Sequence, residues 1–345
     1  MPQGTLSRFA LTLCLHACIS SPMGQANKYE HVGLSAGAER RPIARNANTC
    51  SSAKAAKQRS DAQGFVYMVA LAAQACPLTI KPPASGLSAS DGITIQTEEG
   101  KEMYSFTSRV RFSEVDCDQQ MTLHAILNYF QDCSIFHSAH VHLSIDELTE
   151  MGCAWVLTSW QVIVDRYPKL GEEILISTWP YGFKGFYGYR NFTIRDADGT
   201  VCAYANTIWT FLDMKTMHPM KVQEWLGDAY GLDEQYPMEC APRKVKVPKE
   251  KLVKAAPVPV VSSHTDVYRH MNNAVYVQLA QEMLPEGTAV RQMRAEYRTA
   301  AVAGDVMYPY IAEDDGKYII NFQNENGGTF AAVEFTIKAS ALRVH

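Results

Sequence analysis

Four polar residues suited to hydrolytic chemistry stand close together, immediately before an apolar segment with helical spacing. They are Asp266, His270, Asn272 and Asn273. A carboxylate can act as a general base or a nucleophile, and an imidazole four residues later can orient water or polarise a carbonyl group. Backbone N–H groups at the start of a helix can stabilise a developing negative charge. The stretch predicts an acid–base site at the mouth of a helix.

The same stretch recurs 150 residues earlier in the chain. Ser113-Glu114-Val115-Asp116 aligns without a gap with the segment from Ser263 to Asp266, Met121 aligns with Met271, and Asp132 aligns with Glu282. The later copy has His270, Asn272 and Asn273 where the earlier one has Gln120, Thr122 and Leu123. A duplicated module with its chemistry in the second copy is therefore predicted, and the first copy is expected to serve as scaffold and pocket.

A purely structural role is the alternative for these residues. Asp266 could cap the helix and the two Asn residues could support a turn.

Other constellations have less support. Gly33-Leu34-Ser35-Ala36-Gly37 has the letters of a nucleophile elbow but lacks a predicted strand before it and a helix after it. No Cys follows Cys240, so a Cys–His nucleophile has no cysteine in the copy that keeps the histidine. No His, Cys or acidic residues have a known metal-ligand spacing.

The pattern Asp-x-x-x-His-x-Asn-Asn-x-x-Tyr resembles that of the thioesterases of the hotdog superfamily, and Asp266, His270, Asn272, Asn273 and Tyr276 match it. Two such modules, with the pattern intact only in the second, resemble the acyl-acyl carrier protein thioesterases of plants and bacteria. The resemblance covers roughly residues 103–340. The chain departs from that family at Tyr268, where members often have Asn, and at Ala300-Ala301, where plant members have a Glu-Cys pair.

The resemblance implies roles for further residues. Asp266 would be the base or nucleophile, and Glu282 would support His270 from the helix. Tyr268, Tyr276 and Trp155 would contact the substrate, with the aromatic residues of the first module forming part of an acyl pocket. Neither a metal nor an organic cofactor is expected.

Hydrophobic periodicity indicates the elements that must position these residues. Alternation from Tyr104 to Phe112 is typical of a half-buried strand, and the spacing of Leu123, Ile126, Leu127, Phe130 and Cys133 is typical of a helix. Ser144 and Glu147 form a capping-box signal for a second short helix. Strand-like runs follow at 155–167, 173–179, 187–195 and 201–212, and again at 291–297, 306–312, 317–323 and 330–339. Periodicity alone favours an α+β fold. The resemblance implies a tandem (double) hotdog, each half a long central helix wrapped by an antiparallel sheet.

The predicted organisation has four parts. Residues 1–102 lack a sustained period and are expected to be an unstructured extension, with Met103 as the natural start of translation. Residues 103–223 form the degenerate hotdog module, 224–259 a linker, and 260–345 the catalytic hotdog module. The length of 345 residues suits two such modules.

Composition limits the partners. The net charge of −4 gives no reason to expect nucleic-acid binding, and no apolar run is long enough to span a membrane. Nine scattered Cys residues favour reduced thiols in the cytoplasm. The linker is basic and could be a solvated connection or a docking strip for an acidic acyl carrier protein. Its cationic residues include Arg243, Lys244, Lys246, Lys249 and Lys251.

Hydrolysis of the acyl-acyl carrier protein thioester, which releases a free fatty acid, is therefore the expected activity. An acyl-CoA thioesterase of the same fold, a dehydratase or hydratase, and a non-catalytic acyl-binding hotdog protein are the alternatives. A second copy of the chain is also considered as a partner. Acyl chain length cannot be derived from the sequence.

Overall fold

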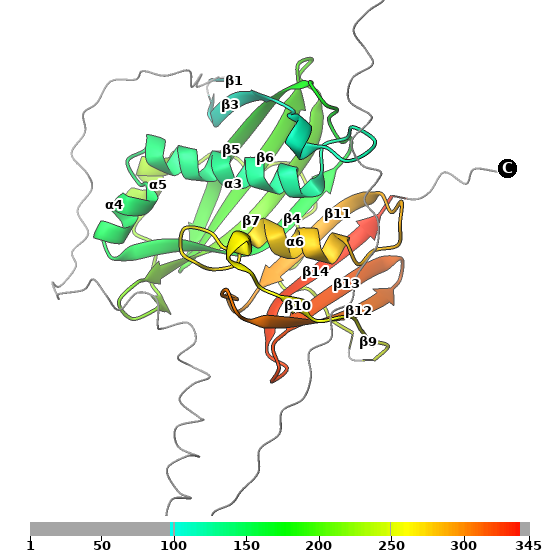
Figure 1. The fold of residues 1–345 in the computed structure, drawn as a ribbon. Helices are drawn as coiled ribbons and strands as arrows, with labels where there is room; N and C mark the ends of the chain where they lie inside the picture. The colour runs from blue at the N-terminus through cyan, green and yellow to red at the C-terminus, as the bar shows by residue number, and fades with distance from the viewer. Residues whose placement is uncertain (1–96, 99–100, 249, 339–345) are drawn as a thin grey trace, which may run out of the picture. The chain divides into compact units, whose positions relative to one another are not determined.

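The protein is described here by a computed structural model, which covers residues 97–98, 101–248 and 250–338 (Figure 1). These residues form a twelve-stranded antiparallel sheet, together with a separate pair of strands, β1 (Thr97–Glu98) and β2 (Lys101–Glu102). Most of the predicted N-terminal extension, including Gly33 to Gly37, lies outside the described residues, as do Lys249 and the end of the last predicted strand.

The first module runs through a strand, two helices and an antiparallel meander. Its elements are β3 (Tyr104–Arg109), η1 (Phe112–Glu114), α3 (Leu123–His140), α4 (Ile145–Glu150), β4 (Cys153–Val164), β5 (Glu173–Lys184), β6 (Tyr187–Asp196), β7 (Val201–Asp213) and β8 (His218–Pro219). The Thr122 hydroxyl accepts a hydrogen bond from the amide of Ala125 and so caps α3. The capping box expected at Ser144 and Glu147 is confirmed at the start of α4.

The second module repeats this order after a connection. The connecting elements are α5 (Glu224–Tyr230), β9 (Val253–Lys254) and β10 (Val258–Pro259), and the module itself contains η2 (Ser262–His264), α6 (Asn273–Gln281), β11 (Val290–Tyr297), β12 (Val306–Asp314), β13 (Lys317–Gln323) and β14 (Thr329–Ile337). The main strands lie in the order β10-β12-β13-β14-β11-β4-β7-β6-β5-β3.

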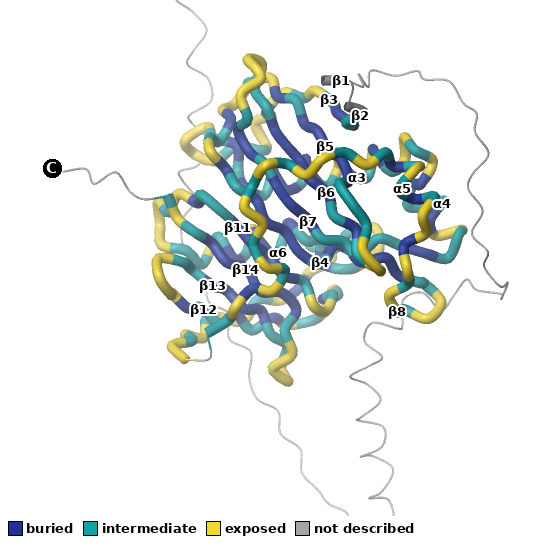
Figure 2. The backbone as a smooth tube through the Cα atoms, turned by 180° about the vertical axis from the view of Figure 1, so that it is seen from behind, coloured by how far each residue is buried: buried dark blue, intermediate teal, exposed yellow. Residues whose placement is uncertain are grey.

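The modules join through β4 and β11, which pair antiparallel with Trp160 opposite Ala295. Residues of α3, α6 and the facing side of the strands form one hydrophobic cluster, so both helices pack on the same face of the shared sheet. Figure 2 shows buried residues along the strands and exposed residues in the connecting loops. The prediction of an α+β fold with a long helix against an antiparallel sheet in each half is confirmed.

Two elements extend beyond their predicted ends. Helix α3 continues past Cys133 to His140. Its last turns contain two buried polar residues, Ser134 and His137, which do not fit the apolar period read from the sequence. Strand β5 continues past Trp179 to Lys184, with a shift in register between Pro180 and Gly182. Pro180 has no backbone N–H, so an irregularity near it is expected.

The connection between the modules crosses the face of the sheet opposite α6. We call residues 232–257 the strap. Along β13, Ile320 and Phe322 belong to the helix-side core, whereas Ile319, on the other side, packs against Val245 of the strap. The amide of Val245 donates to the buried Glu296 carboxylate at 3.1 Å. The strap is therefore anchored by packing and by a charge-assisted hydrogen bond.

Candidate active site

The loop before α6 repeats the backbone of the loop before α3 bond for bond. The amide of Asp266 donates to the carbonyl of His270 at 2.8 Å, as that of Asp116 does to Gln120 at 2.9 Å. Arg269 has φ 60° and its counterpart Gln119 has φ 59°. The predicted duplication is thus visible in the local geometry as well as in the sequence.

Asp266 holds this loop through one carboxylate oxygen. Its Oδ1 accepts hydrogen bonds from the amides of Tyr268 at 2.9 Å and His270 at 3.2 Å. Asp116 makes the same two bonds, to Asp118 and Gln120, each at 2.9 Å. The loop-supporting role is therefore common to both copies. Any chemistry specific to the second copy depends on the groups that surround Asp266.

Burial raises the pKa of the Asp266 carboxyl above its ordinary value. The two amides and the nearby His270 oppose this effect by favouring the ionised form. Within the described part of the chain, Oδ2 accepts no hydrogen bond. A carboxylate with one committed oxygen, one available oxygen and a raised pKa is suited to accept a proton from water.

His270 lies next to Asp266 in space as well as in sequence. It is half-buried, and its backbone forms an isolated bridge with Val302, as Gln120 does with Lys169 in the first module. The loop holds the two residues together through the bond from the His270 amide to the Asp266 carboxylate and the bond from the Asp266 amide to the His270 carbonyl. At the equivalent place, the first module has an amide side chain that cannot exchange a proton.

Asn272 and Asn273 begin the helix. Asn272 is the N-cap of α6, and its Oδ1 accepts a hydrogen bond from the amide of Ala274 at 2.8 Å. Asn273 is the first helical residue, and its amide has no acceptor among the described residues. An amide of this kind, at the positive end of a helix dipole, is a candidate donor to an oxyanion.

The two predicted substrate-contacting tyrosines lie in different environments. Tyr276 is 2% exposed, and its hydroxyl accepts a hydrogen bond from the amide of Ala301 at 3.0 Å. Burial raises the pKa of this phenol. Tyr268 lies at the loop tip and is 37% exposed. Burial also raises the Tyr268 pKa, with further contributions from the charges of Asp266 and Asp146.

The structure does not bring Glu282 to His270. Glu282 is exposed and is the C-cap of α6, whereas Asn272 is the N-cap. The helix between them rises about 13 Å at 1.5 Å per residue. Glu282 therefore lies at the opposite end of the helix from the loop.

Trp155 lies in a separate hydrophobic cluster of the first module. Its ring stacks on Phe183 with the centroids 5.7 Å apart, and a Cβ on Gly188 would come within 3.0 Å of it. Phe183 lines an open groove of about 570 Å³ beside α5. The tryptophan thus supports the wall of a groove, and its position in the acyl pocket stays a prediction.

The alanines at the plant-type Glu-Cys position lie against the active-site loop. The Ala301 carbonyl accepts a hydrogen bond from the amide of Met271 at 2.8 Å, and Ala301 is fully buried. Methyl groups therefore stand here where the resemblance places a carboxylate and a thiol in plant members. Neither can supply a nucleophile or a base.

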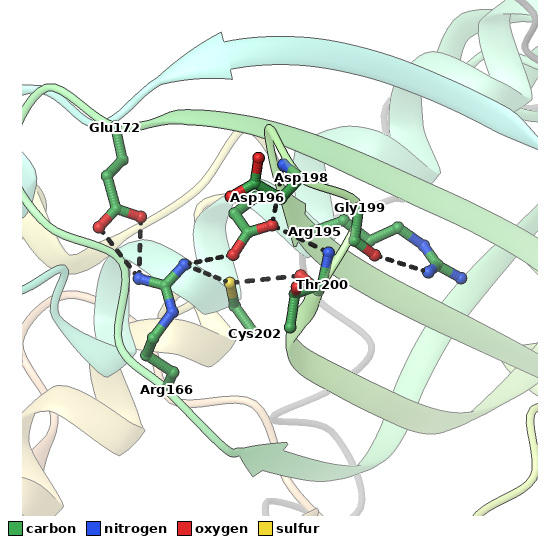
Figure 3. Close-up of polar contacts among 8 residues, drawn as sticks. All are labelled: Arg166, Glu172, Arg195, Asp196, Asp198, Gly199, Thr200 and Cys202. Carbon is green, nitrogen blue, oxygen red and sulfur yellow. Dashed lines mark hydrogen bonds and ion pairs between the residues drawn. The ribbon is translucent and has the colours of Figure 1, made fainter.

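The thiols of the described residues all lie outside the second module. They are Cys117, Cys133, Cys153, Cys202 and Cys240. Figure 3 shows Cys202, whose sulfur lies 3.1 Å from Nη2 of Arg166. Arg166 also bonds Glu172 and Asp196, so this cluster ties two turns of the sheet together. Burial raises the Cys202 pKa, which keeps the thiol protonated and unreactive.

The described residues contain neither a candidate metal site nor a membrane-spanning helix. No cluster of three or more His, Cys, Asp or Glu side chains there could hold a metal ion. No helix there is long and apolar enough to cross a membrane.

Comparison with known proteins identifies similar sequences and similar structures. Residues 101–230 match the family model described as the acyl-ACP thioesterase N-terminal domain. The chain resembles the acyl-ACP thioesterases in sequence and in fold. It is 27% identical over 210 residues to the palmitoyl-acyl carrier protein thioesterase of Arabidopsis thaliana, a match that covers 55% of this chain and 50% of the relative. A protein of the same name from Cuphea hookeriana is 25% identical over 242 residues, covering 64% of this chain and 58% of the relative. The chain thus spans about half the length of these curated relatives.

Solved structures establish the fold. An acyl-ACP thioesterase from Bacteroides thetaiotaomicron superposes with a TM-score of 0.64 at 22% identity, over 70% of this chain and all (100%) of the other. The 12:0-ACP thioesterase of Umbellularia californica gives a TM-score of 0.62 at 18% identity, over 68% of this chain and 97% of the other. The predicted tandem hotdog fold is confirmed.

Proposed function

We propose that this protein hydrolyses the thioester bond of an acyl-acyl carrier protein and releases a free fatty acid. The observation that carries the proposal is the loop before α6, where a carboxyl of raised pKa, Asp266, adjoins His270 and the open amide of Asn273. The family match supports the same activity.

In this proposal the groups of the loop divide the reaction among them. Asp266 either removes a proton from water, which attacks the thioester carbonyl, or attacks that carbonyl itself. His270 orients the water. The Asn273 amide stabilises the negative charge that develops on the carbonyl oxygen. Collapse of the tetrahedral intermediate breaks the carbon–sulfur bond. On the water route, the proton held by Asp266 passes to the leaving thiolate. On the direct route, water hydrolyses the acyl–Asp266 anhydride, which releases the fatty acid, restores the carboxylate and supplies the proton of the thiol.

A non-catalytic acyl-binding role is the second candidate, and a specific observation favours it. Asp116 makes the same two loop bonds as Asp266 in a module without the histidine. Retention of Asp at position 266 thus has a structural reason that is independent of chemistry.

Release of free thiol separates these candidates. Acyl carrier protein and CoA thioesters of several chain lengths are the substrates, and an enoyl thioester tests for hydration. Asp266→Asn and His270→Ala should each lower turnover by roughly 10²- to 10⁴-fold, the range for loss of a positioned acid–base group. Asp116→Asn is the matched control because it makes the same carboxyl-to-amide change at the equivalent loop position, where Oδ1 can still accept the two amides, and it should retain most of the turnover. Release of thiol at the uncatalysed rate by the wild type would favour the binding role, and faster release from CoA would favour the acyl-CoA alternative.

The strap is the proposed docking site for the acidic carrier. Lys246 and Lys251 are exposed, whereas Arg243 lies 3.8 Å from the buried Glu296 carboxylate and Lys254 lies over the Tyr308 ring. The exposed lysines are therefore the ones free to steer an acidic partner. Beyond β9 and β10 the chain leads directly into the active-site loop, which gives the strap a connection to the site.

We also propose a cytoplasmic location. The five cysteines of the described residues are free thiols, as is usual in a reducing compartment. Cell fractionation that recovered the activity outside the cytoplasm would refute this part.

A further inference from the structure

One side chain of the first module reaches the start of the active-site helix. The Nδ1 atom of His124, in the first turn of α3, lies 3.3 Å from the carbonyl oxygen of Ala274 in the first turn of α6. Ala274 directly follows Asn273, whose amide is the proposed oxyanion donor. The contact therefore joins the first module to the segment where the chemistry is proposed.

The two hydrogen-bond partners of His124 require the same proton position. The Ala274 carbonyl only accepts, so Nδ1 must carry a hydrogen. On the other side of the ring, the amide nitrogen of Asn128 lies 3.0 Å from Nε2 and only donates, so Nε2 must be unprotonated. Asn128 thus holds His124 as the neutral tautomer that donates to α6.

The contact lies where equivalent positions of the duplicated modules meet. Position 124 corresponds to position 274 in the 150-residue repeat. When equivalent residues of two related modules touch, the pseudo-twofold axis passes between them. A symmetric pair would offer the same group in both directions. Here Ala274 has no side-chain donor. The hydrogen bond is therefore donated only by the first module, which lacks the site histidine, to the second module, which has it.

We propose that His124 is a positioning residue for the active site, a role that rests on the proposed thioesterase function. It anchors the first turn of α6 from the neighbouring module. The Tyr297 hydroxyl anchors the same turn from the module's own sheet by donating to the carbonyl of Asn273 at 2.9 Å. Together the two donors hold the open amide of Asn273 in place relative to Asp266 and His270. A shift of about 1 Å at such a position can cost on the order of 10²-fold in rate, so loss of one anchor is expected to cost about tenfold.

Two substitutions separate the donor from the bulk of the ring. His124→Leu fills a similar volume without a donor, whereas His124→Asn places an amide nitrogen close to the position of Nδ1. The Leu variant should lose about tenfold in kcat with KM for the acyl thioester within about twofold of the wild type. The Asn variant should recover kcat to within about threefold. An Asn variant as slow as the Leu variant would overturn the proposal, as would a Leu variant with raised KM and normal kcat, which would place His124 against the substrate.

Amide hydrogen exchange provides a readout that does not depend on activity. In the Leu variant, the amides of residues 275–278 should exchange about tenfold faster than in the wild type, and the Asn variant should restore their protection. Unchanged protection in the Leu variant would overturn the proposal. If the wild type hydrolyses no thioester, the proposed function fails, while the exchange data still decide whether His124 anchors α6.

Discussion

At the scale of single residues, Asp266 performs two tasks that pull its pKa in opposite directions. The amides of Tyr268 and His270 bond Oδ1 and favour the ionised form, whereas burial favours the neutral form and has the larger effect. A carboxylate can thus hold a loop and still have a pKa suited to proton transfer.

The pH dependence of turnover should report this raised pKa. The proposed base must be deprotonated, so kcat/KM should fall as the pH drops through the pKa of Asp266. Because that pKa lies above the ordinary 3.8, the decline should begin at a higher pH than for an ordinary carboxyl. A pH–rate profile of the wild type measures it, with Asp116→Asn as a control that should keep the same acidic limb. A limb at or below the ordinary value would exclude Asp266 as the base.

A second residue with a shifted pKa, His137, belongs to the core of the first module. It is 4% exposed, and its Nδ1 accepts a hydrogen bond from Nη1 of Arg190 at 2.9 Å. Burial, reinforced by the charges of Arg190 and His140, lowers the His137 pKa to about 2. Arg190 itself is buried against the Tyr230 ring, with the guanidinium carbon 5.3 Å from the ring centroid.

Stability should therefore fall with acidification in a window set by His137. The imidazole is neutral in the fold but takes up a proton in the unfolded chain below its ordinary pKa of 6.5, so protons favour unfolding. Between about pH 6 and pH 4 the free energy of unfolding should drop by about 1.4 kcal/mol per pH unit from this residue. His137→Asn, which keeps an acceptor for Arg190, should flatten that slope in denaturant titrations at several pH values. Identical slopes in the two proteins would assign the acid sensitivity to other groups.

At the scale of elements, α3 and α6 have the same kind of N-terminal cap but follow loops of different composition. Thr122 caps α3 through the amide of Ala125, and Asn272 caps α6 through the amide of Ala274. Each cap stabilises its helix, but the loop before α6 contains Asp266 and His270, whereas the loop before α3 contains Asp116 and Gln120. The functional difference between the helices thus lies in what precedes them.

Matched cap substitutions should expose that difference. Thr122→Ala and Asn272→Ala should each lower the free energy of unfolding by about 1 kcal/mol, measured by denaturant titration. Only Asn272→Ala should also lower kcat by about tenfold or more, because it loosens the helix start that carries the proposed oxyanion donor. Equal effects of both substitutions on kcat would mean that the cap acts through general stability.

At the scale of the whole molecule, the two modules differ in what they contribute. One continuous sheet carries both modules, the first supplies the longer helix and an aromatic cluster, and the second supplies the candidate site. The strap crosses the sheet face opposite the helices and is held by Glu296 beneath it. The strap is therefore anchored to the sheet at Val245, next to the exposed Lys246.

Salt dependence tests whether the exposed lysines of the strap steer the carrier. Lys246→Glu combined with Lys251→Glu should lower kcat/KM for the carrier-bound substrate, with little change for a small synthetic thioester. The wild-type advantage should shrink as salt shortens the Debye length from about 10 Å at 0.1 M. Lys184→Glu combined with Lys215→Glu makes the same charge change at exposed positions of the first module and should have less effect. Equal losses in both double variants would point to net charge, and equal losses on both substrates to folding of the strap.

Local patterns in the sequence were sufficient to predict most of the elements and to select the candidate loop. Alternation and helical spacing placed the strands and the central helices, because burial on one face imposes those periods on the residues. The register of the duplication placed Asp266 and His270 in one loop, because close neighbours in sequence must stay close in space. The tandem hotdog itself came from the family pattern, since periodicity extends only to fold class.

Only the tertiary structure decided which distant groups meet. Glu282 was expected beside His270 but lies at the other end of α6, because the nine residues of the helix separate them. The contact of His124 with Ala274 was not predicted, because it depends on how two helices 150 residues apart pack. The buried contact between His137 and Arg190 joins α3 to β6, and no local pattern encodes it. Contacts between distant segments depend on how all the strands and helices pack together, which no local pattern contains. The sequence therefore indicated the candidate chemistry, and only the fold showed which distant residues support it.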